Sequence, residues 1–159
     1  MVGPPMRLTD LLTPANIVVP LAATEKNAAI AELVDVLARG GQVADPAAVL
    51  EAVLERESTR STGIGSGLAI PHGKTKGTSE IAVALGKPST PIEFGSVDGR
   101  GVTLICLLAS PPDKTGQHLQ TLSAVSRLFV DDTLRQKVNK ATDAKVLYDL
   151  IVKHEDAAA

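Results

Sequence analysis

A histidine stands on a tight turn in the segment AIPHGK, residues 69–74, directly after a short apolar run. Pro71 fixes its own φ and restricts the residue before it, whereas Gly73 leaves the exit from the turn free. Such a turn can hold the His72 ring in a set direction toward solvent. A neutral imidazole is a competent nucleophile near pH 7 and can carry a phosphoryl group. The turn alone is also compatible with a histidine that only hydrogen-bonds its own backbone.

A second histidine and a pair of arginines suit the same chemistry. His118 stands at the start of a predicted helix with Thr115 as candidate N-cap, and the positive helix end should keep its ring neutral. Arg56 lies near the end of the predicted helix before the turn, and Arg60 follows four residues on. Phosphoryl transfer needs such cations because negative charge spreads over three equatorial oxygens. Considered alone, His118 could be a histidine at a helix edge without a function. The two arginines could likewise be solvated surface residues. His154, in the polar tail, receives no role.

The segment STGIGSGLAIPHG, residues 61–73, is predicted to be a glycine-rich loop. Glycine lets the backbone approach a ligand, and hydroxyls such as that of Ser61 can donate to phosphate oxygens. The segment is not a dinucleotide fingerprint, since Leu68 stands where the third glycine is required, and no Gly-Lys-Ser/Thr follows as in a Walker loop. The loop therefore indicates an anion site without identifying the ligand.

Apolar periodicity predicts the elements that must position these residues. Residues 102–109 form an apolar run, ended by Pro111 and Pro112, that is typical of a central strand covered on both faces. Alternating apolar residues predict a half-buried strand at 80–87, and a third strand is expected at 16–21, where Pro20 should stop it. Helices are expected at 27–41, 45–57, 116–130 and 143–153. The first few residues and 155–159 should fray. The pattern favours an α/β or α+β layered domain with a small mixed sheet.

Composition restricts the function further. The chain has 159 residues, which fits one domain, and 44% of them are hydrophobic but only 2% aromatic, which argues against platforms that stack nucleic-acid bases. The formal charge of -2, without a long basic run, argues against a phosphate-backbone binder. Cys106 is the only cysteine and should be a buried thiol. No stretch approaches the ~18 apolar residues of a membrane span, so we expect a cytoplasmic protein without membrane insertion.

Together these residues resemble the enzyme IIA domain of the fructose/mannitol class of the bacterial phosphotransferase system. The matching stretches are ERESTRSTGIGSGLAIPHGK, PIEFGSVDGRGVTLICLLASP and HLQTLSAVSRLF, and the resemblance covers about residues 8–153 of a single domain, 1–159. His118 lies 46 residues after His72 (118 − 72) and Arg56 lies 16 before it (72 − 56), as in the family. Arg60 is a departure, because family members often have glycine there.

The resemblance implies an α/β (α+β) fold with a mixed five-stranded sheet flanked by helices. It implies that His72 accepts a phosphoryl group from the phosphocarrier HPr or from its nitrogen-system counterpart. His118 would orient the ring and phosphate, and Arg56 with Ser61 and Gly73 would bind the phosphoryl oxygens, with no cofactor or metal. We expect a shallow depression rimmed by residues such as Ile64 and Leu68. The two histidines should then lie within ~8 Å, because hydrogen bonds of about 2.7–3.2 Å must reach a shared phosphoryl group.

Three interpretations of the role remain. The stretch HLQTLSAVSRLF favours a nitrogen-related regulator, as does our expectation of a single domain with no permease or IIB domain attached. Such a regulator would act on targets such as potassium transporters or sensor kinases. The alternative is a transport component that passes the phosphoryl group to a separate IIB protein for fructose or mannitol uptake. A metal hydrolase with His72 and His118 as ligands is a weaker possibility, since the sequence has no HExxH, cysteine pair or obvious third ligand.

Overall fold

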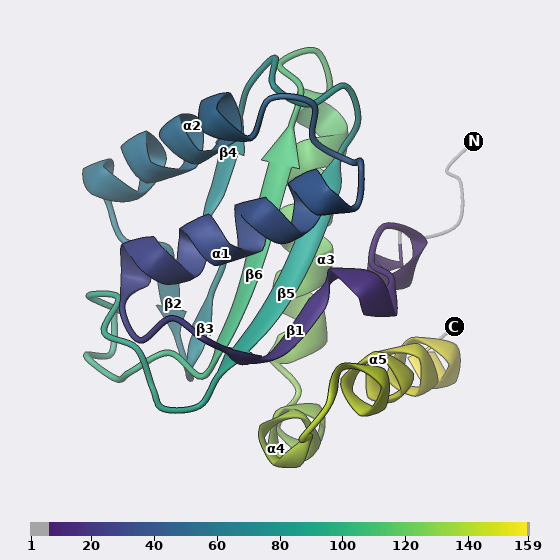
Figure 1. The fold of residues 1–159 in the computed structure, drawn as a ribbon. Helices are drawn as coiled ribbons and strands as arrows, with labels where there is room; N and C mark the ends of the chain where they lie inside the picture. Colours follow the sequence, from purple (N-terminus) through teal and green to yellow (C-terminus); the bar gives the residue numbers. More distant parts are fainter. Residues whose placement is uncertain (1–6, 159) are drawn as a thin grey trace.

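The computed structural model describes residues 7–158 and shows an open mixed sheet with helices on both faces (Figure 1). The strands are β1 (Ile17–Leu21), β2 (Gly63–Gly65), β3 (Leu68–Ala69), β4 (His72–Lys74), β5 (Ala82–Pro88) and β6 (Leu104–Ser110). Their order is β1-β5-β6-β3-β2, and β4 also pairs with β6. Strand β6 runs parallel to β3 and β4 and antiparallel to β5. The predicted fold class is confirmed, with six strands in place of the expected five.

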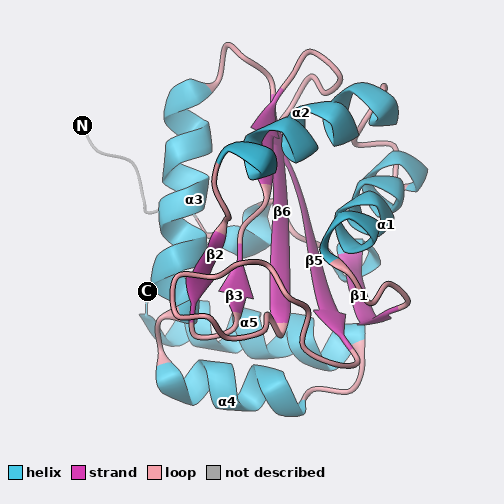
Figure 2. Cartoon of the chain, turned by 90° about the vertical axis from the view of Figure 1, so that its left-hand side faces the viewer, coloured by secondary structure: helices cyan, strands magenta, loops and turns pink. Residues whose placement is uncertain are grey.

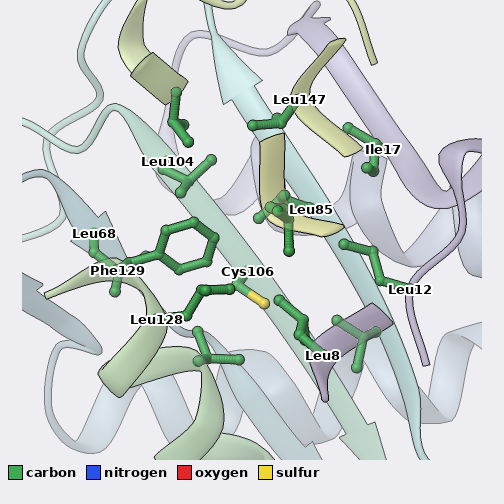
Figure 3. Close-up of a cluster of buried hydrophobic side chains, with 14 of the residues drawn as sticks. Leu8, Leu12, Ile17, Leu68, Leu85, Leu104, Cys106, Leu128, Phe129 and Leu147 are labelled. Atoms are coloured by element: carbon green, nitrogen blue, oxygen red, sulfur yellow. The ribbon is translucent and has the colours of Figure 1, made fainter. Parts of the chain in front are cut away.

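Helices cover the sheet in two layers, one on each face (Figure 2). They are α1 (Lys26–Arg39), α2 (Pro46–Thr59), α3 (Thr115–Phe129), α4 (Asp132–Lys140) and α5 (Ala144–Ala158), with 3-10 turns at Leu8–Asp10 and Pro14–Asn16. The layer of α1 and α2 packs on side chains such as Ala84 and Leu107. The layer of α3, α4 and α5 packs on the opposite face, around Leu85 and Cys106 (Figure 3). Cys106 is fully buried as predicted, and burial raises the pKa of its thiol to about 12.

Strand β5 differs from its prediction because both of its faces are buried. Val83 and Leu85 face α3 and its neighbours, as the alternation indicated, but Ala82 and Ala84 are equally buried under the opposite helix layer. Alanine is small enough to lie close beneath a helix and contributes little to an apolar pattern. The predicted stop at Pro20 is also wrong, since Pro20 lies inside β1, which ends at Leu21.

The glycine-rich segment and the C-terminus are more regular than expected. Residues 63–69 form a hairpin of β2 and β3 instead of a loop, and β4 follows it. Helix α4 was not predicted, because only Leu134 and Val138 of its residues are buried. Residues 155 and 156 belong to α5, and the Glu155 carboxylate accepts hydrogen bonds from the backbone of Leu8 and Thr9, so fraying there is wrong. The fraying predicted for the first residues falls on 1–6, outside the described residues.

Candidate active site

His72 opens β4, and its position follows from the pairing of β4 with β6. His72 lies opposite Leu108 and Lys74 opposite Ser110, so these four side chains point to the face covered by α3. Gly73 points to the other face, where an added Cβ would lie 3.0 Å from backbone atoms of Ala52 and Val53 in α2. A side chain at Gly73 would therefore push β4 away from α2, and with it His72.

The His72 ring is held in one orientation by its own turn. Its Nδ1 lies 2.8 Å from the carbonyl oxygen of Ile70, which can only accept, so Nδ1 carries the proton. In the neutral ring the lone pair then lies on Nε2. Partial burial lowers the pKa of His72 below its ordinary value, and the charge of Arg56 lowers it further against the raising effect of the Ile70 contact. His72 is therefore neutral at pH 7, with the lone pair on Nε2.

His118 stands in the first turn of α3 and is only 3% exposed. Its Nδ1 lies 2.6 Å from the Ser110 hydroxyl, and burial lowers the pKa of the ring to about 4, helped by the nearby His72 and Lys74. The ring is neutral as predicted, with burial as the main cause in place of the helix end. The predicted N-cap is wrong, because Lys114 occupies that position and Thr115 is the first helical residue.

The two imidazoles lie against each other. Their ring centroids are 5.4 Å apart and their planes form an angle of 60°. This separation of the ring centroids lies below the upper limit of ~8 Å expected for two histidines that share a phosphoryl group through hydrogen bonds. Each Nδ1 is occupied by a protein partner, and within residues 7–158 neither Nε2 has one.

A depression of about 320 Å³ opens beside His72. It is lined by Arg56, Arg60, Ser61, Thr62, Gly63, Ile64, Ile70, His72, Val97, Leu122 and Ser126. Ile64 is 50% exposed and Val97 80%, so an apolar rim exists as predicted, but Leu68 is buried in the core and does not reach it. Arg56 and Ser61 thus share this depression with His72, whereas Gly73 does not line it.

Two polar side chains of the depression, those of Arg56 and Ser61, hydrogen-bond to neighbouring backbone. Arg56 donates to the carbonyl of Arg60 at 3.0 Å. The Ser61 hydroxyl donates to the carbonyl of Phe94 at 2.5 Å and accepts from the N–H of Gly63 at 3.0 Å. To bind a phosphoryl oxygen, the Ser61 hydroxyl must exchange the Phe94 carbonyl for that oxygen, because it has only one proton to donate. The Arg56 guanidinium has further N–H donors besides the one that contacts Arg60.

A buried carboxylate that the sequence analysis missed fixes the segment after α2. Glu57 accepts from the backbone N–H of Thr62 at 3.0 Å and from its hydroxyl at 2.6 Å. It also pairs with Lys26 at 3.5 Å. Its spacing was a usable signal, because Val49, Val53 and Glu57 are four residues apart on the buried face of α2.

A metal hydrolase with His72 and His118 as ligands would need at least one further ligand, and the described part of the chain places none beside them. Among residues 7–158, no three His, Cys, Asp or Glu side chains group closely enough to hold a metal ion. Nor is any helix in this range long and apolar enough to cross a membrane.

Comparison with known proteins agrees with this geometry. The family described as "Phosphoenolpyruvate-dependent sugar phosphotransferase system, EIIA 2" matches residues 10–154. A nitrogen regulatory protein of Bradyrhizobium diazoefficiens is 34% identical over 97% of this chain and 100% of its own length. The crystal structure of nitrogen regulatory protein IIA-Ntr from Neisseria meningitidis superposes with a TM-score of 0.82 at 30% identity, covering 89% of this chain and 97% of that one.

A longer phosphotransferase system component is similar over a shorter part of its length. The fructose-specific EIIABC component of Bacillus subtilis is 35% identical over 94% of this chain, which spans only 24% of that protein. The similarity to it and to the two nitrogen regulatory proteins extends over almost all of the described fold. The chain belongs to the EIIA 2 family of the phosphoenolpyruvate-dependent sugar phosphotransferase system and is a phosphotransferase component.

Proposed function

We propose that the protein carries a phosphoryl group on Nε2 of His72. The observation that carries this proposal is the hydrogen bond from Nδ1–H of His72 to the Ile70 carbonyl, which leaves the Nε2 lone pair free in a neutral ring. That lone pair forms a bond to phosphorus while the bond between phosphorus and the donor's histidine breaks, and its electrons return to the donor's imidazole. The donor is a phosphohistidine carrier, HPr or its nitrogen-system counterpart.

The neighbours of His72 supply the electrostatic stabilisation that phosphoryl transfer requires. His118 donates from its ring to a phosphoryl oxygen, and Arg56 donates to another. The Ser61 hydroxyl exchanges the Phe94 carbonyl for a phosphoryl oxygen. The assignment of Gly73 to phosphoryl binding remains a prediction, beside the packing role that its contact with α2 gives it.

The surface around the depression suits a protein donor better than a small substrate. A carrier must bring its own phosphohistidine to His72, which requires an open surface with apolar contacts. Ile64 and Val97 are exposed at the rim of the depression. Arg56 and Arg60 add positive charge on the same side, complementary to an incoming phosphoryl group.

The phosphorylation state serves regulation in this proposal. Its support is the similarity to two nitrogen regulatory proteins, that of Bradyrhizobium diazoefficiens at 34% identity and IIA-Ntr from Neisseria meningitidis with a TM-score of 0.82. The free and phosphorylated forms would bind cytoplasmic targets differently, potassium transporters or sensor kinases among them. The second candidate, supported by the fructose-specific relative, is passage of the phosphoryl group to a IIB protein during fructose or mannitol uptake.

The test is intact-mass measurement after incubation with phosphoenolpyruvate, enzyme I and HPr, or with their nitrogen-system counterparts. Wild type should gain one phosphoryl group, His72→Ala none, and the control His154→Ala one as before. The same added mass on His72→Ala would assign the acceptor to another residue. Adding a fructose- or mannitol-type IIB protein then separates the two roles, because rapid loss of the group to IIB supports transport and its retention supports regulation.

A further inference from the structure

Ser110 is the last residue of β6 and the only hydroxyl in that strand, and it is fully buried. Its Oγ lies 2.6 Å from Nδ1 of His118, a residue eight positions further along the chain. Its backbone carbonyl accepts from the N–H of Thr75, which continues the pairing of β4 with β6. The hydroxyl is thus held in place behind the ring of His118 by the end of the central strand.

The burial of this hydroxyl decides where the proton of His118 lies. Within residues 7–158, Nδ1 of His118 is the only hydrogen-bond partner of the Ser110 hydroxyl. If the hydroxyl donates to Nδ1, both groups are satisfied and the ring proton lies on Nε2. If Nδ1 donated instead, the hydroxyl proton would be buried without an acceptor, which costs free energy. We propose that Ser110 is a positioning residue that fixes His118 as the Nε2–H tautomer.

The consequence for catalysis rests on the proposed function of His72. The Ile70 carbonyl fixes the proton of His72 on Nδ1, whereas the Ser110 hydroxyl fixes that of His118 on Nε2. The pair then presents one lone pair, as nucleophile, and one N–H, as donor to the phosphoryl oxygens. The opposite tautomer of His118 would direct a second lone pair at those oxygens and repel them.

The register of β4 and β6 brings the His72 turn and the Ser110 hydroxyl to the same site. His72 lies opposite Leu108, and Ser110 follows two residues later on the same face of β6. The strand that positions the nucleophile through backbone pairing therefore also positions the second histidine through a side chain.

The tautomer is measured on the unphosphorylated protein, independently of any phosphoryl transfer. In long-range 15N–1H correlation spectra, Nε2 of His118 should give the shift of a protonated nitrogen and Nδ1 that of an unprotonated one. Ser110→Ala should move part of the population to Nδ1–H, and Ser110→Thr, which keeps the hydroxyl, should restore the wild-type pattern. A wild-type His118 protonated on Nδ1 would overturn the proposal even if Ser110→Ala did not fold.

Phosphorylation rates complete the test. Ser110→Ala should slow phosphorylation of His72 by about 3- to 10-fold, less than the roughly 10²–10³-fold that loss of a whole oxyanion donor costs. Ser123→Ala, an exposed serine on α3, is the matched control and should leave the rate unchanged. A Ser110→Ala protein with both the tautomer and the rate of wild type would refute the role of Ser110. A wild type with the expected tautomer but no phosphorylation would instead refute the function proposed for His72.

Discussion

The imidazole rings of His72 and His118 lie with their centroids 5.4 Å apart, although 46 residues (118 − 72) separate them in the chain. Strand β6 connects them, since it pairs with β4 at His72 and contacts His118 through the Ser110 hydroxyl. The Nδ1 atom of each ring contacts a protein group, the Ile70 carbonyl for His72 and the Ser110 hydroxyl for His118. The two Nε2 atoms are therefore the ring nitrogens that can contact an external group. An arrangement of this kind can hold a phosphoryl group between a nucleophile and a hydrogen-bond donor.

His118→Ala should slow phosphorylation of His72 without moving the acceptor. A preorganised donor to a developing negative charge is typically worth about 10²–10³-fold in rate, and His118 is the ring placed to supply it. The measurement is rapid-quench phosphorylation from phosphorylated HPr, followed by mass mapping of the acceptor. Because the change also leaves the buried Ser110 hydroxyl without its partner, rates are compared well below the melting temperature. A wild-type rate in the folded variant would make His118 a structural residue only.

Stability should fall as the pH drops from about 6.5 toward about 4. Burial lowers the pKa of His118 from 6.5 to about 4 in the folded protein, so the unfolded chain binds a proton that the folded chain does not. The neutral ring's contribution to stability is complete above pH 6.5, falls through this window and is lost below pH 4. The lowered pKa of His72 acts in the same direction.

Urea unfolding at a series of pH values measures this slope, and His118→Gln supplies the control. The variant keeps the same carboxylates, whose titration also affects stability below pH 5, but lacks the titrating ring at position 118. The difference between the two stability curves should therefore grow in favour of wild type from pH 4 to 6.5. Parallel curves would mean that His118 titrates alike in the folded and unfolded states.

The sequence predicts the elements whose patterns are strong by themselves. The apolar run of β6 and the helical periodicity of α1 need no tertiary information, because burial of a whole strand or of one helix face leaves a period in the sequence. Helix α4 has only two buried residues, and β3 only two residues in all, so neither leaves such a period. Glu155 was expected in a frayed tail because its partners, the backbone of Leu8 and Thr9, lie at the opposite end of the chain.

Some residues of the site can be predicted from the sequence, and others can be recognised only from the fold. His72, His118 and Arg56 can be identified because their types and spacings form a long motif, and the structure brings His72 next to His118 and into one depression with Arg56. The roles of Glu57 and Ser110 depend on which groups surround them, and neither residue type is unusual at a helix end or strand end. Only the fold shows that Glu57 is buried against Thr62 and Lys26, and Ser110 against His118.

Glu57→Gln should destabilise the fold and slow phosphorylation together. The carboxylate accepts two hydrogen bonds from Thr62, and an amide nitrogen in place of one oxygen would face a donor. The loss should be about 1–3 kcal/mol, the cost of a buried donor without its partner. Thr62 lines the depression next to Ser61, so its displacement should also lower the rate.

Glu55→Gln, two residues earlier in α2 and exposed, is the matched control for Glu57→Gln. It should change the free energy of unfolding by no more than ~0.5 kcal/mol, as exposed substitutions usually do. Chemical unfolding and phosphorylation of both variants are compared side by side. Equal stabilities would show that the Glu57 carboxylate does not hold the Thr62 segment.

Two glycines beside the histidines should respond to alanine in opposite directions. A Cβ at Gly73 would lie 3.0 Å from backbone atoms of α2, and backbone cannot rotate away as a side chain can. Gly73→Ala should therefore cost about 1–3 kcal/mol, as overpacking does, and slow phosphorylation because β4 carries His72.

A Cβ at Gly116, two residues before His118 in α3, would meet nothing within 4 Å. Gly116→Ala should stabilise the protein by about 0.4–1 kcal/mol by restricting the unfolded chain, with the phosphorylation rate unchanged. Thermal and urea unfolding of the two variants measure the difference, and a Gly73→Ala protein as stable and as active as Gly116→Ala would show that β4 can move from α2 without disturbing His72.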